Sequence, residues 1–226
     1  MPSDTRQSEE VAIEVDGGHV GGTLNIASDA QGIVIFSHGS GSSRFSPRNR
    51  AVATRLQQAH LATLLVDLRT ATEEIVDNET GQLRFNIPFL GRRLSTVTDW
   101  ALQHPGVRRL KIGYFGASTG AAAALVAASE RDDIAAIVSR GGRPDLAGNA
   151  LERVHSPTLL LVGSNDRDVL ALNRNASARL GRECKLETVQ GATHLFEEPG
   201  ALEQVAERAT EWFLRWLPYA ENRRIM

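Results

Sequence analysis

Short, almost wholly apolar segments alternate with longer segments of mixed polarity along most of the chain. The apolar segments include "GIVIFSH", "LATLLVDL", "IAAIVSR" and "TLLLVGS". Strands that are buried on both faces of a sheet have this composition, and their alternation with helices is typical of parallel βαβ crossovers. The intervening helices are predicted at about residues 47–59, 90–103, 119–129, 169–180 and 202–217.

The first part of the chain has a different pattern. "VAIEVDGGHVGGTLNIA" reads as two strands, residues 11–15 and 19–26, joined at an Asp-Gly-Gly turn. An Asp-Gly pair between alternating apolar residues favours a β-hairpin. The predicted fold is therefore α/β, a three-layer αβα sandwich whose mostly parallel sheet of about eight strands has an antiparallel N-terminal edge.

The length and composition favour one domain. With 226 residues, 42% of them hydrophobic, the chain can form one sizeable core. We expect a single domain over residues 11–217, with a mobile N-terminal tail at 1–10 and a C-terminal tail at 218–226. Residues 68–88 lack clear periodicity and exceed the usual connection length, so this segment is expected to be a binding-site flap or a surface excursion.

Charge and cysteine content limit the partners. The 25 basic and 27 acidic residues give a net charge of -2, which provides no electrostatic footprint for nucleic acid or an anionic membrane. Cys184 is the only cysteine, no apolar run is long enough for a membrane span, and the polar N-terminus lacks the apolar core of a signal peptide. We expect a cytoplasmic protein with a small-molecule substrate, either a monomer or a homodimer.

A single serine lies where a β-type segment meets a helix-forming segment. Gly116-Ala117-Ser118-Thr119-Gly120 matches the pattern G-x-S-x-G, in which small flanking residues allow a strained turn that projects the serine hydroxyl. The bare pattern also occurs in turns whose serine only caps the next helix. The flanking strand and helix favour a nucleophile.

A serine nucleophile needs a base and an acid that orients the base. Asp166 follows the strand "TLLLVGS", and His194 lies in a loop after the last predicted strand. The order Ser, Asp, His along the chain is the order expected after such an elbow. Asp168 competes with Asp166 for the acid role, and either carboxylate has an alternative role at the start of the next helix.

The loop after "IVIFSH" contains small residues whose backbone N–H groups can face a pocket. With the N–H of Thr119, that of Ser40 is predicted to hold a developing oxyanion, and Gly41 is the second choice. His38 is expected to shape this loop rather than to transfer protons.

In this order, "FSHGSGSS", "GYFGASTGAAAAL", "LLVGSNDRDV" and "GATHLFEEPG" resemble an α/β-hydrolase of the dienelactone hydrolase-like branch, over nearly the whole chain. The resemblance implies the fold without a large cap, the nucleophile-base-acid set and the oxyanion hole. Dienelactone hydrolase itself has a cysteine where this chain has Ser118, and a glutamate near the loop where it has His38-Gly39. Both departures count against a dienelactone substrate.

These residues predict a serine esterase, thioesterase or lactonase that works through an acyl-enzyme. Acyl transfer to an acceptor other than water, peroxyacid formation, and a ligand-binding or receptor protein on the same fold stay open as alternatives. No nucleotide loop or metal-ligand spacing is present, so no cofactor or metal is expected. Two arginine-containing loops, represented by Arg44 and Arg140, could bind an anionic substrate or could pair with nearby acids.

Overall fold

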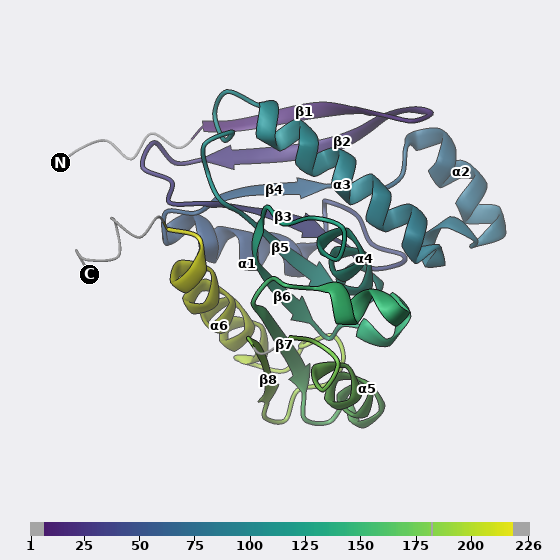
Figure 1. Ribbon diagram of the computed structural model, residues 1–226, viewed down its shortest axis with the longest axis vertical. Coiled ribbons are helices and arrows are strands. Elements are labelled where there is room, and N and C mark those ends of the chain that lie inside the picture. The colour runs from purple at the N-terminus through teal and green to yellow at the C-terminus, as the bar shows by residue number, and fades with distance from the viewer. Residues whose placement is uncertain (1–6, 182, 219–226) are drawn as a thin grey trace.

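A computed structural model describes residues 7–181 and 183–218 and contains one eight-stranded sheet. Its strand order is β1-β2-β4-β3-β5-β6-β7-β8, from the top to the bottom of Figure 1. The strands are β1 (Gln7–Val15), β2 (Gly18–Ile26), β3 (Ile33–Ser37), β4 (Ala62–Val66), β5 (Ile112–Ala117), β6 (Ile134–Arg140), β7 (Thr158–Gly163) and β8 (Cys184–Val189).

The two N-terminal strands form the antiparallel edge of the sheet. β1 pairs with β2 and β2 with β4 in antiparallel register, whereas β4, β3 and β5 to β8 are mutually parallel. The predicted fold class is confirmed. The predicted N-terminal tail is too long, because residues 7–10 belong to β1 and Gln7 pairs with Ile26. The rest of that tail, and residues 219–226 of the C-terminal one, lie outside the described residues.

Helices cover both faces of the sheet. α1 and α6 pack against each other on one face, and α3, α4, α5 and the 3-10 segment η2 lie on the other (Figure 1). The helices are α1 (Pro47–Gln58), α2 (Ala71–Thr80), α3 (Ile87–Gln103), α4 (Thr119–Ala128), α5 (Arg167–Ser177) and α6 (Ala201–Trp216), with 3-10 segments η1 (Leu83–Phe85) and η2 (Pro144–Arg153).

The central strands separate two apolar layers. In β3, Val34 and Phe36 pack toward α1 and α6, whereas Ile33 and Ile35 face the layer under α3 and α4. Because both faces are covered, every position of β3, β5 and β7 is buried, and most of these positions are apolar, as the continuous apolar segments predict. Because these strands are parallel, their carboxyl ends lie at one edge of the sheet, where the candidate site is formed.

The segment at residues 68–88 contains structure that its sequence pattern does not suggest. It contains α2 and η1. The helix α3 begins at Ile87, before the start predicted at about residue 90. A capping box begins α2, in which Thr70 Oγ1 accepts from Glu73 N and Glu73 Oε2 accepts from Thr70 N. Ile75 and Val76 of this helix are exposed, so the segment lacks the apolar face that would reveal a helix by periodicity. It is a surface excursion beyond β4.

The side chain of Asp77 joins α2 to η1 and to the end of the loop before α2. Its side chain is fully buried and accepts hydrogen bonds from Leu83 N at 2.7 Å and from Arg84 Nε at 2.8 Å. Arg69 Nε lies 3.5 Å from the same carboxylate. Burial by itself would raise the pKa of Asp77, but the hydrogen bonds from Arg84 and Leu83 outweigh it and hold the pKa below its usual value.

Replacing Asp77 with alanine is expected to lower the free energy of unfolding by about 3 kcal/mol, since it leaves Arg84 Nε and the backbone N–H groups of Leu83 and Arg84 without their acceptor. Chemical denaturation measures this loss, and Glu79→Ala, at an exposed position of the same helix, is the control expected to change stability by less than about 0.5 kcal/mol. Because the pKa is lowered on folding, the contribution of Asp77 should be present at neutral pH and be lost as pH falls below about 4. Equal stability of the two variants would contradict the anchoring role.

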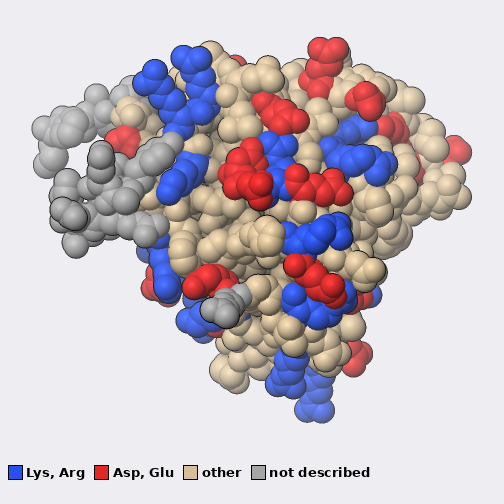
Figure 2. Space-filling view, in the orientation of Figure 1, with Lys and Arg blue, Asp and Glu red and all other residues tan. Residues whose placement is uncertain are grey.

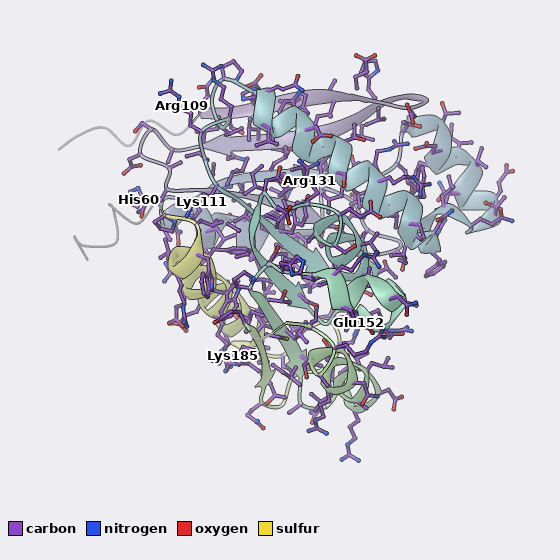
Figure 3. All side chains as sticks on the ribbon, in the orientation of Figure 1. His60, Arg109, Lys111, Arg131, Glu152 and Lys185 are labelled. Carbon is purple, nitrogen blue, oxygen red and sulfur yellow. The ribbon has the colours of Figure 1, made fainter. Side chains whose placement is uncertain are left out.

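Basic and acidic side chains are interspersed over the face shown in Figure 2. Several form ion pairs between elements, such as Arg131, labelled in Figure 3, which pairs with Asp99 of α3 at 2.7 Å and Asp133 at 2.6 Å. Glu152 of η2 pairs with Arg179 at 3.0 Å, beyond the end of α5. Among the described residues, no helix combines the length and the apolar character that crossing a membrane requires.

Candidate active site

Ser118 is the single residue between β5 and α4. Its backbone has φ 51° and ψ -121°, a conformation that is rare for a residue with a side chain. A Cβ on Gly116 would lie 2.4 Å from Ala121 Cα, and one on Gly120 would lie 2.2 Å from Ser37 O. The Ser118 side chain makes no hydrogen bond that caps α4. The local geometry is therefore that of a strained elbow and not that of a helix cap.

Asp166 and His194 are brought together by the loops after β7 and β8. Asp166 precedes α5 but its side chain does not cap the helix, and its Oδ2 instead lies 2.7 Å from His194 Nδ1. Asp168 lies in the first turn of α5. A carboxylate at Nδ1 favours the tautomer with the proton on Nδ1, which leaves Nε2 free to accept a proton. Of the two candidate acids, Asp166 is the one in contact with the histidine.

The loop that carries this histidine is held by polar contacts within itself and to the loop after β7. Glu198 Oε1 accepts from Thr193 N at 3.0 Å and from Thr193 Oγ1 at 2.5 Å, and Asn165 N donates to Ala192 O at 3.0 Å. A Cβ on Gly163 would lie 2.3 Å from Ala192 O, so glycine is needed for this close approach. The sequence pattern predicts neither Asn165 nor Glu198 as support, because a polar loop residue gives no sign of its partner.

Ser118 and His194 line one cavity of about 250 Å³. Its other walls come from the loop after β3, including Ser40, from the first turn of α1, including Arg48, and from the end of β6, at Arg140. This volume lies just below the range of about 300–1,000 Å³ that is usual for small-molecule sites, which fits a small ligand. A groove of about 300 Å³ between α1 and α6 is larger but is lined by no nucleophile-base pair. Chemistry and not size therefore selects the Ser118 cavity.

The two predicted oxyanion donors contact each other. Thr119 is the first residue of α4, where a backbone N–H has no acceptor within the helix. Ser40 N, however, donates to Thr119 Oγ1 at 2.8 Å, so the Ser40 N–H already has a partner. A Cβ on Gly39 would lie 3.1 Å from Ser118 Cβ, which shows how closely this loop packs on the elbow.

His38 is buried beneath the same loop. Its Nδ1 lies 3.0 Å from Gly39 O, and its Nε2 accepts from Leu68 N at 3.3 Å. Burial lowers the pKa of this imidazole, which favours the neutral form. Both ring nitrogens therefore contact backbone groups, as expected of a residue that shapes the loop.

The two predicted arginine contacts have different positions. Arg44 is not among the residues that line the Ser118 cavity, and it pairs with Glu10 at 3.1 Å and Asp67 at 3.4 Å. The prediction of Arg44 as a substrate contact is therefore not supported by its position, since acids near β1 and β4 take up its charge. Arg140 does line the cavity, together with Arg48. In the described part of the chain, no cluster of three or more His, Cys, Asp or Glu side chains could hold a metal ion.

No family model matches the chain. Two curated proteins, from two strains of Mycobacterium tuberculosis, are 52% identical to it over 209 residues and carry the provisional name phosphoribosyl transferase. The match covers 92% of this chain and 46% of each relative, so the chain spans about half the length of these relatives.

Solved structures match the chain over nearly its full length. A dienelactone hydrolase from Anabaena variabilis is 54% identical, with a TM-score of 0.92 over 94% of this chain and 99% of that chain. Est1E from Butyrivibrio proteoclasticus is 20% identical, with a TM-score of 0.76 over 91% of this chain and 98% of that chain. The second likeness concerns the fold alone.

Proposed function

Because this chain belongs to the dienelactone hydrolase branch of the α/β-hydrolase superfamily, we propose that it is a serine hydrolase of small carboxylic esters, thioesters or lactones. One observation carries the proposal: strained Ser118 lines the same cavity as His194, whose Nδ1 is held by Asp166 at 2.7 Å. A serine hydroxyl is a weak nucleophile at neutral pH, and a base oriented by an acid supplies the activation it needs.

In the proposed reaction, Ser118 Oγ attacks the substrate carbonyl carbon while His194 Nε2 takes the hydroxyl proton. Asp166 holds the imidazole in the required tautomer and stabilises its charged form. The imidazolium returns the proton to the leaving oxygen or sulfur, and an acyl-enzyme on Ser118 remains. Water, deprotonated by the same histidine, then attacks the acyl group and releases the acid.

The tetrahedral intermediates carry a negative oxygen that must be stabilised. The N–H groups of Thr119 and Ser40 are the proposed donors, each contributing about 3 kcal/mol to the lowering of the barrier. Since Ser40 N donates to Thr119 Oγ1 in the ligand-free protein, the oxyanion has to replace this hydroxyl as acceptor. A full negative charge is the stronger acceptor, so the exchange favours the transition state over the free enzyme.

The provisional name of the curated relatives is not carried to this chain. The match covers 46% of those proteins, and their name concerns the longer molecule. Acyl transfer to another acceptor and peroxyacid formation use the same three residues and differ only in what attacks the acyl-enzyme. Product analysis with water, alcohols and hydrogen peroxide in competition separates these reactions from hydrolysis.

Replacing Asp166 with asparagine is expected to lower kcat for p-nitrophenyl acetate by about 10³- to 10⁴-fold, because the amide can hold the imidazole in the wrong tautomer. Asp168→Asn is the matched control, since Asp168 lies in the first turn of α5 and is expected to leave kcat within about twofold. Stopped-flow or steady-state kinetics measure both variants. Equal activity of the two variants would remove Asp166 from the proposed mechanism.

A further inference from the structure

The imidazole of His194 is fixed by few contacts of its own. Its side chain is 39% exposed, and the one hydrogen bond that it makes among the described residues goes to Asp166 at 2.7 Å. The next residue, Leu195, is 41% exposed. Burial in the apolar core therefore holds neither side chain. The place of the imidazole depends on the backbone of the segment that carries it, residues 190–198, which we call the histidine loop.

The backbone of the histidine loop is strained two residues after His194. Phe196 has φ 57°, in the left-handed region that a residue with a side chain rarely adopts. Its ring is 2% exposed and belongs to the apolar layer under α1 and α6. A strained conformation persists only where the surrounding contacts over-determine it. The buried ring is one such contact, and it anchors the loop on the far side of the histidine.

Glu198 closes the same loop across the histidine. Its Oε1 accepts from Thr193 N at 3.0 Å and from Thr193 Oγ1 at 2.5 Å, and Thr193 directly precedes His194. The hydrogen bond from the Thr193 hydroxyl holds the pKa of Glu198 below its ordinary value, so the acceptor is charged at neutral pH. Hydrogen bonds to a charged acceptor are roughly twice as strong as neutral ones. The carboxylate thus fixes the peptide group that leads into the histidine.

The start of the histidine loop is held from another direction, by the loop after β7. Gly191 N donates to Ser164 Oγ at 2.8 Å, and Asn165 Nδ2 donates to Gly191 O at 2.8 Å. These contacts end before Thr193. The N–H and the hydroxyl of Thr193 both depend on Glu198, which is therefore the polar contact nearest to the histidine along the backbone.

A role in holding the fold together does not account for this carboxylate. Among the described residues, both hydrogen bonds of the Glu198 side chain go to Thr193 of its own loop, whereas Asp77 joins separate elements. The second oxygen, Oε2, is buried without a partner. A carboxylate oxygen that is removed from water without a hydrogen bond lowers stability. The benefit of Glu198 is thus local, and it falls on the residue beside the proposed base.

We propose that Glu198 is a positioning residue for the catalytic base: by binding Thr193 it sets the place of His194 Nε2 relative to Ser118 Oγ, while Asp166 orients the ring. The inference rests on the proposed function and adds a fourth side chain to it. A displacement of about 1 Å at a reacting group can cost about 10²-fold in rate. A small shift of the histidine loop should therefore affect catalysis more than stability.

Replacing Glu198 with alanine is expected to lower kcat and kcat/KM for p-nitrophenyl acetate together, by about 10- to 100-fold, because proton transfer is misaligned in the transition state. Glu198→Gln should stay within about threefold of the parent protein, since its amide oxygen can accept the same two hydrogen bonds. Glu203→Ala, at an exposed position in the first turn of α6, is the control and should match the parent. Parent-like kinetics of Glu198→Ala would overturn the inference, as would equal losses in Glu198→Ala and Glu198→Gln.

A double-mutant cycle tests whether Glu198 acts through Thr193. Thr193→Val removes the hydroxyl and keeps the N–H, so its loss of kcat should be smaller than that of Glu198→Ala. The combined variant should be no slower than Glu198→Ala, because the contact is already lost. If the two losses multiply in the combined variant, Glu198 acts by another route and the inference is wrong.

Stability distinguishes positioning from a structural role. Glu198 makes its bonds within one loop and leaves Oε2 without a partner, so the Tm of Glu198→Ala should lie within about 3 °C of that of Glu203→Ala. A much lower Tm, together with parent-like kcat at a temperature where the variant is fully folded, would show that Glu198 is structural and would overturn the inference.

A readout without turnover separates this inference from the proposed function. Hydrogen exchange measured by mass spectrometry on peptides that cover residues 190–198 should be about tenfold faster in Glu198→Ala than in Glu203→Ala, with exchange elsewhere unchanged. Faster exchange in a protein that cleaves no ester would reject the proposed function and support the positioning contact. Equal exchange of the histidine loop in the two variants would overturn the inference, even if the parent protein is an active esterase.

Discussion

Replacing Ser118 with alanine is expected to lower kcat for ester hydrolysis by about 10⁴- to 10⁶-fold, because the nucleophile is lost and the histidine and aspartate then have no hydroxyl to activate. Steady-state kinetics on p-nitrophenyl acetate measure this change. Stability gives a second readout, since Ser118 holds φ 51° and ψ -121° with a side chain present. Ser118→Gly removes the strained Cβ and should raise the free energy of unfolding by about 1 kcal/mol.

The two readouts should move in opposite directions in Ser118→Gly, with hydrolysis lost and stability gained. Such a result is expected where a strained backbone serves chemistry and not folding. Undiminished hydrolysis in Ser118→Ala would exclude the serine mechanism. A large loss of stability in Ser118→Gly would mean that the side chain has a structural role.

Replacing Gly120 with alanine is expected to lower the free energy of unfolding by more than about 4 kcal/mol, enough to prevent a stable fold in a protein of ordinary stability. The added Cβ would lie 2.2 Å from Ser37 O and 2.5 Å from His38 O. Both atoms are backbone, so the clash can be relieved only by moving β3 away from α4, which would also displace the oxyanion loop.

Gly181→Ala is the matched control, because among the described residues a Cβ there meets only Val154 O, at an ordinary distance of 3.6 Å. Its free energy of unfolding should change by less than about 0.5 kcal/mol. Denaturation curves and the yield of folded protein measure both variants. A Gly120→Ala protein as stable as the Gly181→Ala protein would contradict the close packing of the elbow on β3.

The elements that carry the site are those that the sequence pattern predicts most directly. β3, β5 and β7 are covered on both faces, so every position is buried, and the strands are visible as nearly continuous apolar segments. The elbow is visible because sterics restrict the positions two residues before and two residues after its serine to glycine. Where burial or backbone geometry limits which residues a position can hold, the structure of that position can be predicted from the sequence.

Where an element is exposed to solvent or is held by residues far away in the chain, the sequence pattern carries less information about its structure. The helix α2 is missed by periodicity because its outer residues Ile75 and Val76 are exposed, although the Thr70–Glu73 capping box marks its start. The start of β1 is missed because its first residues are polar and exposed, and only pairing with β2 keeps them extended.

The partners of the two arginines also could not be predicted from the sequence. Arg44 lies in the loop after β3 and Arg140 at the end of β6, and no local sequence feature distinguishes their roles. Only the fold shows that Glu10 and Asp67 neutralise Arg44, whereas Arg140, beside Ser118, has no acid partner among the residues that the structure describes. In the same way, the bond from Ser40 N to Thr119 Oγ1 joins residues far apart in the chain and cannot be predicted from either loop alone.

The most direct test of the central claim is intact-protein mass spectrometry after exposure to a fluorophosphonate probe, with Ser118→Ala and His194→Ala proteins beside the parent. The account predicts one adduct that maps to Ser118, is absent in Ser118→Ala and forms much more slowly in His194→Ala. No adduct on folded parent protein, or an adduct on another residue, would contradict an activated serine at this elbow.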